Sequence, residues 1–227
     1  MKLLSSIKVA TIATTALTLS ILPTLAQSFP DISDNVYKTE IDVAVEKGIV
    51  EGFPDGNFQP DETVTRGQAA VMITKGIASV TPIDLDAKPA NRTVPPFNDV
   101  PDDLWSAKEI YWLQANLYPA NVSQLTGNFR PDDPITRIEL VDFLRRTAEL
   151  VSSRLTGGDS TLPEVDPAIE FSDVTGYEKI LTEQMSEYCR VASPLNDEGD
   201  AFAPTEEAHR DYTAAAIVRA VDCGGTE

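Results

Sequence analysis

The sequence has few of the residues that metal centres, nucleic-acid surfaces and catalytic sites require. Histidine occurs once, at His209, so there is no histidine cluster for a metal, and a cysteine–histidine nucleophile pair is not expected. Lysine and arginine total 18 against 36 aspartates and glutamates, which gives a formal charge of −18 at pH 7. A surface of that sign disfavours nucleic acid and anionic lipid as partners. We therefore expect no metal, no cofactor and no catalytic residue.

Long apolar runs are also scarce, and the one that exists lies at the N-terminus. Lys2 and Lys8 precede an apolar run over residues 9–22, and the segment 24–26 offers a signal peptidase site. The run is short and rich in threonine and serine for a membrane span; an uncleaved anchor is the alternative. We predict a signal peptide at residues 1–26, export, and a mature chain that does not insert into the lipid bilayer.

Cysteine occurs only twice, at Cys189 and Cys223. An even count in an exported chain favours a disulfide, which would stabilise the fold by about 2–4 kcal/mol. Two buried thiols are the alternative, because the sequence does not give their separation.

What the sequence does contain is one pattern written three times. In each copy a proline follows a phenylalanine by two residues, and an arginine follows the proline by six. The three sets are Phe58, Pro60 and Arg66; Phe129, Pro131 and Arg137; and Phe202, Pro204 and Arg210. Each copy opens on a Phe-x-Asp element, at residues 29–32, 97–100 and 171–174. A repeat of about 50 residues cannot bury its apolar face alone, so we expect the three copies to fold together.

Segments rich in proline and glycine separate the copies, and apolar residues at helical spacing lie on both sides of each Phe–Pro–Arg set. The pattern predicts a mainly α fold, in which three tandem helix-loop-helix repeats pack as one domain. The predicted boundaries are repeat 1 at 27–78, a linker at 79–96, repeat 2 at 97–151, a linker at 152–169 and repeat 3 at 170–227.

The start of the second helix is marked clearly in two of the three repeats. Thr65 with Gln68, and Thr136 with Glu139, fit a capping box in which each threonine is the N-cap. The third repeat has His209 at the threonine position, which favours a helix that begins at Thr205 instead.

Arg66 and Arg137 then occupy the first helical position, where a cation opposes the helix dipole at a cost of about 0.3–1 kcal/mol. Recurrence of this penalty suggests an anionic ligand, since free backbone N–H groups and a guanidinium together make a carboxylate or phosphate site. The alternative is an arginine bridged to an acid of a neighbouring repeat.

Repeat 1 resembles an S-layer homology repeat. Residues 52–60, Gly-Phe-Pro-Asp-Gly-Asn-Phe-Gln-Pro, followed by Val64-Thr65-Arg66, are similar to the glycine-rich turn and the threonine-arginine signature of that family. The resemblance extends over all three repeats, although residues 121–128 and 193–200 replace the turn in the second and third. It implies a pseudo-threefold helical domain whose inter-repeat grooves bind pyruvylated or otherwise anionic polysaccharide attached to peptidoglycan.

The resemblance also assigns roles to individual residues. The ligand-binding arginine falls on Arg66 and Arg137, with Arg210 doubtful because its repeat departs from the pattern, and turn residues near the ligand fall around Gly52 and Gly56. These glycines also have a local explanation as positive-φ turn residues. The aromatic residue that opens each first helix could stack on sugar or belong to the core. It falls on Tyr37, Trp105 and Tyr177. The predicted ligand-binding set is Arg66, Arg137, Gly52, Gly56, Asp55, Thr65, Thr136, Trp105, Tyr37 and Arg210.

Two functions from different classes follow. The first is a noncatalytic envelope module that binds peptidoglycan-linked anionic polysaccharide, located in the periplasm or at the cell wall or cell surface. The second is a divergent repeat protein that acts as a structural subunit or binds another protein of the envelope or outer membrane. An enzyme is the least favoured reading, because no carboxylate pair can be placed at glycosidase separation. Since the sequence ends directly after repeat 3, we expect no covalent cargo.

Overall fold

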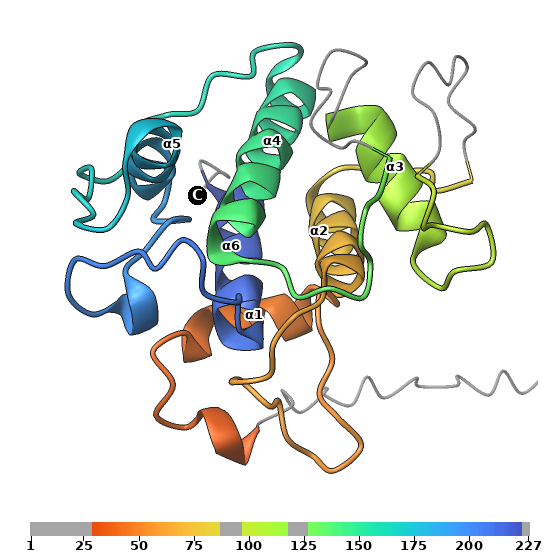
Figure 1. Ribbon diagram of the computed structural model, residues 1–227, viewed down its shortest axis with the longest axis horizontal. Helices are drawn as coiled ribbons and strands as arrows, with labels where there is room; N and C mark the ends of the chain where they lie inside the picture. Colours follow the sequence, from red (N-terminus) through yellow and green to blue (C-terminus); the bar gives the residue numbers. More distant parts are fainter. Residues whose placement is uncertain (1–28, 87–96, 118–126, 224–227) are drawn as a thin grey trace, which may run out of the picture.

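The computed structural model describes residues 29–86, 97–117 and 127–223, and the predicted signal peptide lies outside them. Its described part is mainly helical, which confirms the predicted fold class, and contains no strand (Figure 1). The α-helices are α1 (Lys38–Glu46), α2 (Arg66–Val80), α3 (Ala107–Leu117), α4 (Arg137–Thr156), α5 (Gly176–Glu187) and α6 (Arg210–Asp222), with 3₁₀ turns η1 (Pro30–Ile32) and η2 (Leu195–Asp197).

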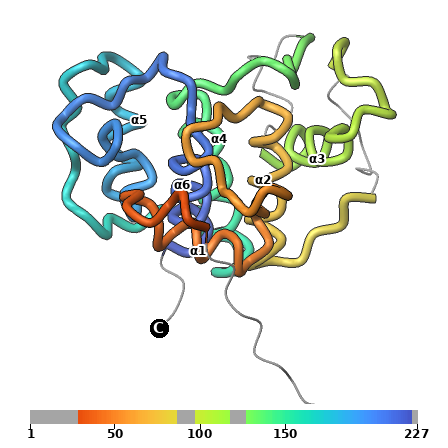
Figure 2. Tube along the Cα trace, turned by 90° about the horizontal axis from the view of Figure 1, so that it is seen from below, coloured from red at the N-terminus to blue at the C-terminus, as the bar shows by residue number. Residues whose placement is uncertain are grey.

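The helices are arranged as a central group with three helices around it. The second helices of the repeats, α2, α4 and α6, contact one another. Each first helix packs on the second helix of the preceding repeat, so α3 lies on α2, α5 on α4, and α1 on α6 (Figures 1 and 2). The contact of α1 with α6 joins the first repeat to the last. None of the described helices combines the length and the apolar character that crossing a bilayer requires.

One apolar core runs through all three repeats. The repeated Phe58, Phe129 and Phe202 are each at most 2% exposed, and so are most apolar residues of the central helices. Gly76 lies where α2 approaches α6, and a Cβ there would stand 2.7 Å from a methyl carbon of Ile217. The central helices thus approach closely because a glycine is placed at their contact.

The aspartate of each Phe-x-Asp opening holds the repeated phenylalanine of its own repeat. Its carboxylate accepts hydrogen bonds of 2.7–3.0 Å from the backbone N–H of that phenylalanine and of the next residue, which has φ between 56° and 61°. The sets are Asp31 with Phe58 and Gln59, Asp99 with Phe129 and Arg130, and Asp173 with Phe202 and Ala203. Two charge-assisted bonds thus stabilise a left-handed residue in each repeat.

A disulfide joins Cys189, just after α5, to Cys223 at the end of α6, with a Cα–Cα distance of 5.6 Å. Both cysteines belong to repeat 3. The bond closes a segment with a sequence separation of 34 residues around the repeat that departs most from the common pattern.

The sequence predicted that the second helix of repeat 3 begins at Thr205. This prediction was wrong, because α6 begins at Arg210 with His209 as its N-cap. His209 has nearly the same backbone angles as Thr65 and Thr136, although its side chain caps nothing. The backbone N–H groups of Arg210 and Asp211 donate to carbonyl oxygens of repeat 1, at 2.9 and 3.1 Å. The next N–H, that of Tyr212, stands where the threonine cap accepts in α2 and α4, and it donates to Oδ1 of Asp211 at 2.6 Å. The carboxylate of Asp211 therefore satisfies the N–H group that a cap would have satisfied.

Candidate functional site

The segments that precede α2, α4 and α6 meet in a closed ring of backbone hydrogen bonds. The N–H of Val64 donates to Ala208, that of Ala208 to Ile135, and that of Ile135 to Val64, at 2.8–3.0 Å. All three residues are buried. The ring requires all three repeats, and it places the N-terminal ends of the three central helices together. The pseudo-threefold packing of whole repeats stays a prediction, with which this cyclic pattern agrees.

The repeated arginines cross the junctions between repeats in one common way. In each case Nε donates to the carbonyl of the repeated phenylalanine in the next repeat, and the guanidinium lies 4.7–5.1 Å from the centre of that ring. The pairs are Arg66 with Phe129 at 2.7 Å, Arg137 with Phe202 at 2.8 Å, and Arg210 with Phe58 at 3.0 Å. The arginine and phenylalanine of the repeated motif are therefore partners between repeats.

The first backbone N–H groups of these helices are also occupied. The two N–H groups that open each helix donate to carbonyl oxygens of the next repeat at 2.8–3.1 Å. The pairs are Arg66 with Asp133, Gly67 with Pro131, Arg137 with Glu206, Ile138 with Pro204, Arg210 with Glu62, and Asp211 with Pro60. The expectation of free N–H groups was therefore wrong. The carbonyl oxygens of the next repeat supply the negative partial charge that offsets a cation at the helix start.

Junction 1–2, between repeats 1 and 2, contains a buried ion pair. Arg66 is 4% exposed, and its Nη1 lies 2.9 Å from Oε1 of Glu139 in repeat 2. Arg130 also contacts Glu139, at 2.7 Å. Arg66 therefore follows the alternative prediction, in which the arginine pairs with an acid of a neighbouring repeat. Burial alone would raise the pKa of Glu139, but the Thr136 N–H and the two arginines outweigh it and hold that pKa below its ordinary value.

In junction 2–3, between repeats 2 and 3, no acidic side chain of the described residues forms an ion pair with the arginine. Arg137 is 2% exposed, and its Nη2 donates to the carbonyl of Ser193 at 2.8 Å. Its guanidinium lies 3.8 Å from the centre of the Tyr212 ring, within cation–π distance. Tyr37 closes this site from repeat 1, with its hydroxyl 3.4 Å from that of Ser193, and burial raises the pKa of Tyr37 to about 12.

Junction 3–1, between repeats 3 and 1, differs from the other two because its arginine, Arg210, is partly exposed. Arg210 donates from Nη2 to the carbonyl of Glu51, and its guanidinium lies 4.9 Å from the ring centre of Phe53, which is 36% exposed. The glycine-rich turn 52–60 therefore adjoins Arg210. Arg66 and Arg137, to which the family resemblance assigns the ligand, instead donate to the repeated phenylalanines of repeats 2 and 3.

The turn itself is an exposed structure held by its own side chains. Asp55 accepts a hydrogen bond from the N–H of Asn57 at 2.9 Å, which lowers the pKa of its carboxyl, and Gln59 donates to its other oxygen. Gly56 has a φ of 86°, so the explanation that glycine is needed here for a positive-φ turn applies to it. Gly52 does not have a positive φ, so that explanation does not apply to it.

The remaining predicted site residues occupy different surroundings. Both capping boxes are confirmed, with Thr65 and Thr136 as N-caps, so each hydroxyl accepts from the backbone within its own helix. Tyr37 is buried, whereas Trp105 and Tyr177 are 61% and 55% exposed. The aromatic residue at this position of the repeat is thus a core residue in repeat 1 and a surface residue in repeats 2 and 3.

Ser106 is a residue of junction 1–2 that the sequence analysis missed. It follows the exposed Trp105, is fully buried, and its hydroxyl has no hydrogen-bond partner among the residues that the structure describes. A Cβ on Gly67 would lie 3.1 Å from this hydroxyl and 3.0 Å from the Pro131 carbonyl oxygen. Repeat 2 has isoleucine at the position of Gly67, a difference that was visible in the sequence.

Comparison with known proteins finds a family that the first repeat resembles. Residues 28–70 match the family model of the S-layer homology domain. An S-layer protein of Bacillus licheniformis is 34% identical over 121 residues, 52% of this chain and 12% of the relative. The cellulosome-anchoring protein of Acetivibrio thermocellus is 30% identical over 111 residues, 48% of this chain and 23% of the relative.

An enzyme is also among the relatives. The amylopullulanase of Thermoanaerobacterium thermosulfurigenes is 26% identical over 200 residues, which is 88% of this chain and 10% of the relative. The chain thus spans between 10% and 23% of the length of these three relatives. Over residues 28–70, the chain is thus similar to the S-layer homology domain.

Proposed function

We propose that this chain is a noncatalytic module that attaches to the cell envelope by binding a peptidoglycan-linked anionic polysaccharide, for example a pyruvylated one. Two relatives named as an S-layer protein and a cellulosome-anchoring protein support envelope attachment. The match to the enzyme covers 10% of the enzyme's length, as expected if the two proteins share a region outside the enzyme's catalytic part. Export and a location in the periplasm, cell wall or cell surface belong to the same proposal.

The polysaccharide is proposed to bind at junction 3–1. We choose this junction because Arg210 is partly exposed and lies beside the exposed glycine-rich turn. Arg66 and Arg137 are 4% and 2% exposed and already engaged by carbonyl oxygens, so a ligand could reach them only after a rearrangement. We assign those two arginines to holding the repeats together.

The chemistry of junction 3–1 suits an acidic sugar. The guanidinium of Arg210 can donate to a carboxylate of the ligand in a charge-assisted bond. Phe53 offers an exposed ring against which the C–H face of a sugar can pack, and the carboxylate of Asp55 can accept from a sugar hydroxyl. Gly52 and Gly56 add no side-chain bulk to this turn. Trp105, which is 61% exposed beside junction 1–2, is proposed as a second aromatic contact.

Sedimentation with peptidoglycan sacculi tests the function. The mature chain, residues 27–227, is mixed with sacculi before and after their linked polysaccharide is removed. We expect the protein to sediment with intact sacculi and to stay in solution with stripped ones. Equal sedimentation with both would contradict the polysaccharide ligand, and failure of the folded protein to sediment with either would contradict envelope attachment.

A protein-binding role is the second candidate, and exposed apolar residues in repeat 3 and in the linker before it favour this role. Val165, Tyr177 and Ile180 are 55%, 55% and 64% exposed, and the last two lie one turn apart on α5. Exposed apolar side chains of this kind can mark an interaction surface for an envelope or outer-membrane protein. This candidate replaces the first if the folded protein does not bind sacculi.

A further inference from the structure

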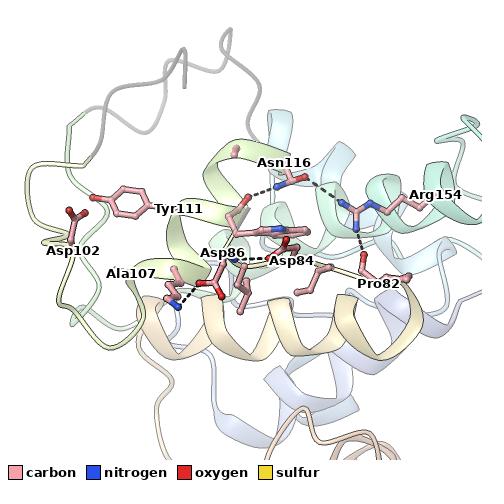
Figure 3. Close-up of a pocket in the computed structure, with 13 residues that line it drawn as sticks. Pro82, Asp84, Asp86, Asp102, Ala107, Tyr111, Asn116 and Arg154 are labelled. Carbon is pink, nitrogen blue, oxygen red and sulfur yellow. Dashed lines mark hydrogen bonds and ion pairs between the residues drawn. The ribbon is translucent and has the colours of Figure 1, made fainter. Parts of the chain in front are cut away.

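A second site lies at the other ends of the central helices, away from the three arginine junctions. It is a pocket of about 840 Å³ between the segment that follows α2, one face of α3 and the last turn of α4 (Figure 3). Because α2 runs from residue 66 to residue 80, its two ends are roughly 20 Å apart. The pocket volume lies within the range of about 300–1,000 Å³ that is usual for small-ligand sites.

Arg154 supplies the cation of this pocket. Its side chain is exposed, and the guanidinium lies 5.3 Å from the centre of the Trp112 ring. It donates to the Thr81 hydroxyl at 3.4 Å. It also donates to the Pro82 carbonyl and the Asn116 side-chain oxygen, at 3.3 and 3.4 Å (Figure 3). These bonds are longer than the usual 2.7–3.2 Å, so a carboxylate that approached closely could replace them with stronger ones.

No acidic side chain among the described residues forms an ion pair with Arg154, although the chain has 36 acids. Among the described residues that line the pocket, the other cation is Lys108, which is held 2.6 Å from Asp86. Of these two cations, Arg154 is therefore the one that can take an anionic group of a ligand without breaking an ion pair.

The rest of the wall suits hydroxyl groups and a flat apolar face. Asp84, Asp86 and Asp102 line the pocket, and their carboxylates accept hydrogen bonds but repel a ligand with many negative charges. The lining also contains apolar side chains, among them Leu85 and Trp112. A ligand that fits carries one anionic group, several hydroxyl donors and a C–H face.

We infer that this pocket binds a sugar residue that carries a single carboxylate, of the uronic-acid type. The carboxylate lies on Arg154, the sugar hydroxyls donate to the aspartates, and the C–H face packs on the apolar lining. The inference is independent of the function proposed for junction 3–1, because the two sites share no residue.

Tryptophan fluorescence tests this site directly. The chain has two tryptophans, so Trp105→Phe leaves Trp112, which lines the pocket, as the only reporter. The probe is galacturonic acid, with galactose as the neutral sugar and acetate as the bare carboxylate. We expect galacturonic acid to change the fluorescence of Trp112 saturably and to bind at least tenfold more tightly than galactose or acetate.

Two further variants in the Trp105→Phe background identify the residue responsible. Arg154→Gln is expected to weaken binding of galacturonic acid at least tenfold, whereas Arg145→Gln, on the same helix but outside the pocket, leaves it unchanged. Circular dichroism verifies that each variant is folded. The inference is overturned by the absence of a saturable change in the folded protein, by equal binding of galacturonic acid to Arg154→Gln, or by equal binding of galactose or acetate.

Discussion

The junctions at Arg137 and Arg210 are built from the same motif but leave different amounts of the arginine exposed. Both arginines begin a central helix and donate from Nε to a phenylalanine carbonyl of the next repeat. Arg137 is then covered by Tyr212 and Tyr37, whereas Arg210 is flanked by an exposed glycine-rich turn. A repeated motif can therefore hold a fold together in one copy and remain accessible to a ligand in another.

The largest expected effect is the loss of Arg137. Arg137→Gln would leave two buried carbonyl groups, those of Phe202 and Ser193, without their charged donor, so we expect the free energy of unfolding to fall by about 3–5 kcal/mol. Arg210→Gln is expected to lower it by about 1–2 kcal/mol, because water can reach that site. Urea unfolding measures both, and Arg145→Gln is the surface control. Equal losses at the two arginines would contradict the difference in burial.

Reduction of the disulfide is the next largest effect, and it separates the junctions of repeat 3 from junction 1–2. Opening the bond between Cys189 and Cys223 should lower the free energy of unfolding by about 3–4 kcal/mol. Amide hydrogen exchange with and without reductant should show faster exchange in α5 and α6 than in α2. Faster exchange spread evenly over all central helices would show that the bond restrains the whole domain instead.

The aspartates that hold the repeated phenylalanines allow a third test. Asp31→Ala and Asp99→Ala each remove an ionised acceptor from two backbone N–H groups, and each should lower the free energy of unfolding by about 2–3 kcal/mol. Only Asp31 holds the phenylalanine that Arg210 contacts, so only Asp31→Ala should also weaken sedimentation with sacculi. Asp103→Ala, at an exposed position, is the control. Weaker sedimentation of both variants would mean that binding depends on overall stability.

The smallest effect is the dependence of junction 1–2 on pH. Because the pKa of Glu139 is lowered in the folded protein, its stabilising contribution is present above the ordinary value of 4.5 and is lost as the pH falls. The free energy of unfolding of the wild type should therefore fall more steeply below pH 4.5 than that of Glu139→Gln. Glu149→Gln, which alters the surface pair with Arg145, serves as the control. Parallel curves for wild type and Glu139→Gln would contradict the assignment.

The sequence predicted those features that depend on local pattern. Apolar spacing gave six helices in three pairs, and the two capping boxes located the starts of α2 and α4. The start of α6 was missed because the side chain of its N-cap residue, His209, makes no cap bond, while its first two N–H groups donate to carbonyl groups of repeat 1, which lie about 150 residues earlier in the chain. A propensity rule that considers only neighbouring residues cannot include such a partner.

The candidate site was harder to predict for the same reason. The constant spacing of phenylalanine and arginine suggested one functional unit per repeat, yet each arginine contacts the phenylalanine of the next repeat. The glycine-rich turn of repeat 1 consequently adjoins Arg210 and not Arg66. The pocket at Arg154 likewise combines residues of both predicted linkers with residues of repeat 2, and no sequence motif connects them.

Sedimentation of Arg210→Gln with polysaccharide-bearing sacculi, beside the wild type and Arg145→Gln, tests the central claim most directly. Circular dichroism first establishes that all three proteins are folded at the temperature used. If junction 3–1 binds the polysaccharide, Arg210→Gln will bind at least tenfold more weakly than the wild type, and Arg145→Gln will bind equally well. Wild-type binding by Arg210→Gln would contradict the assignment of the ligand to this junction.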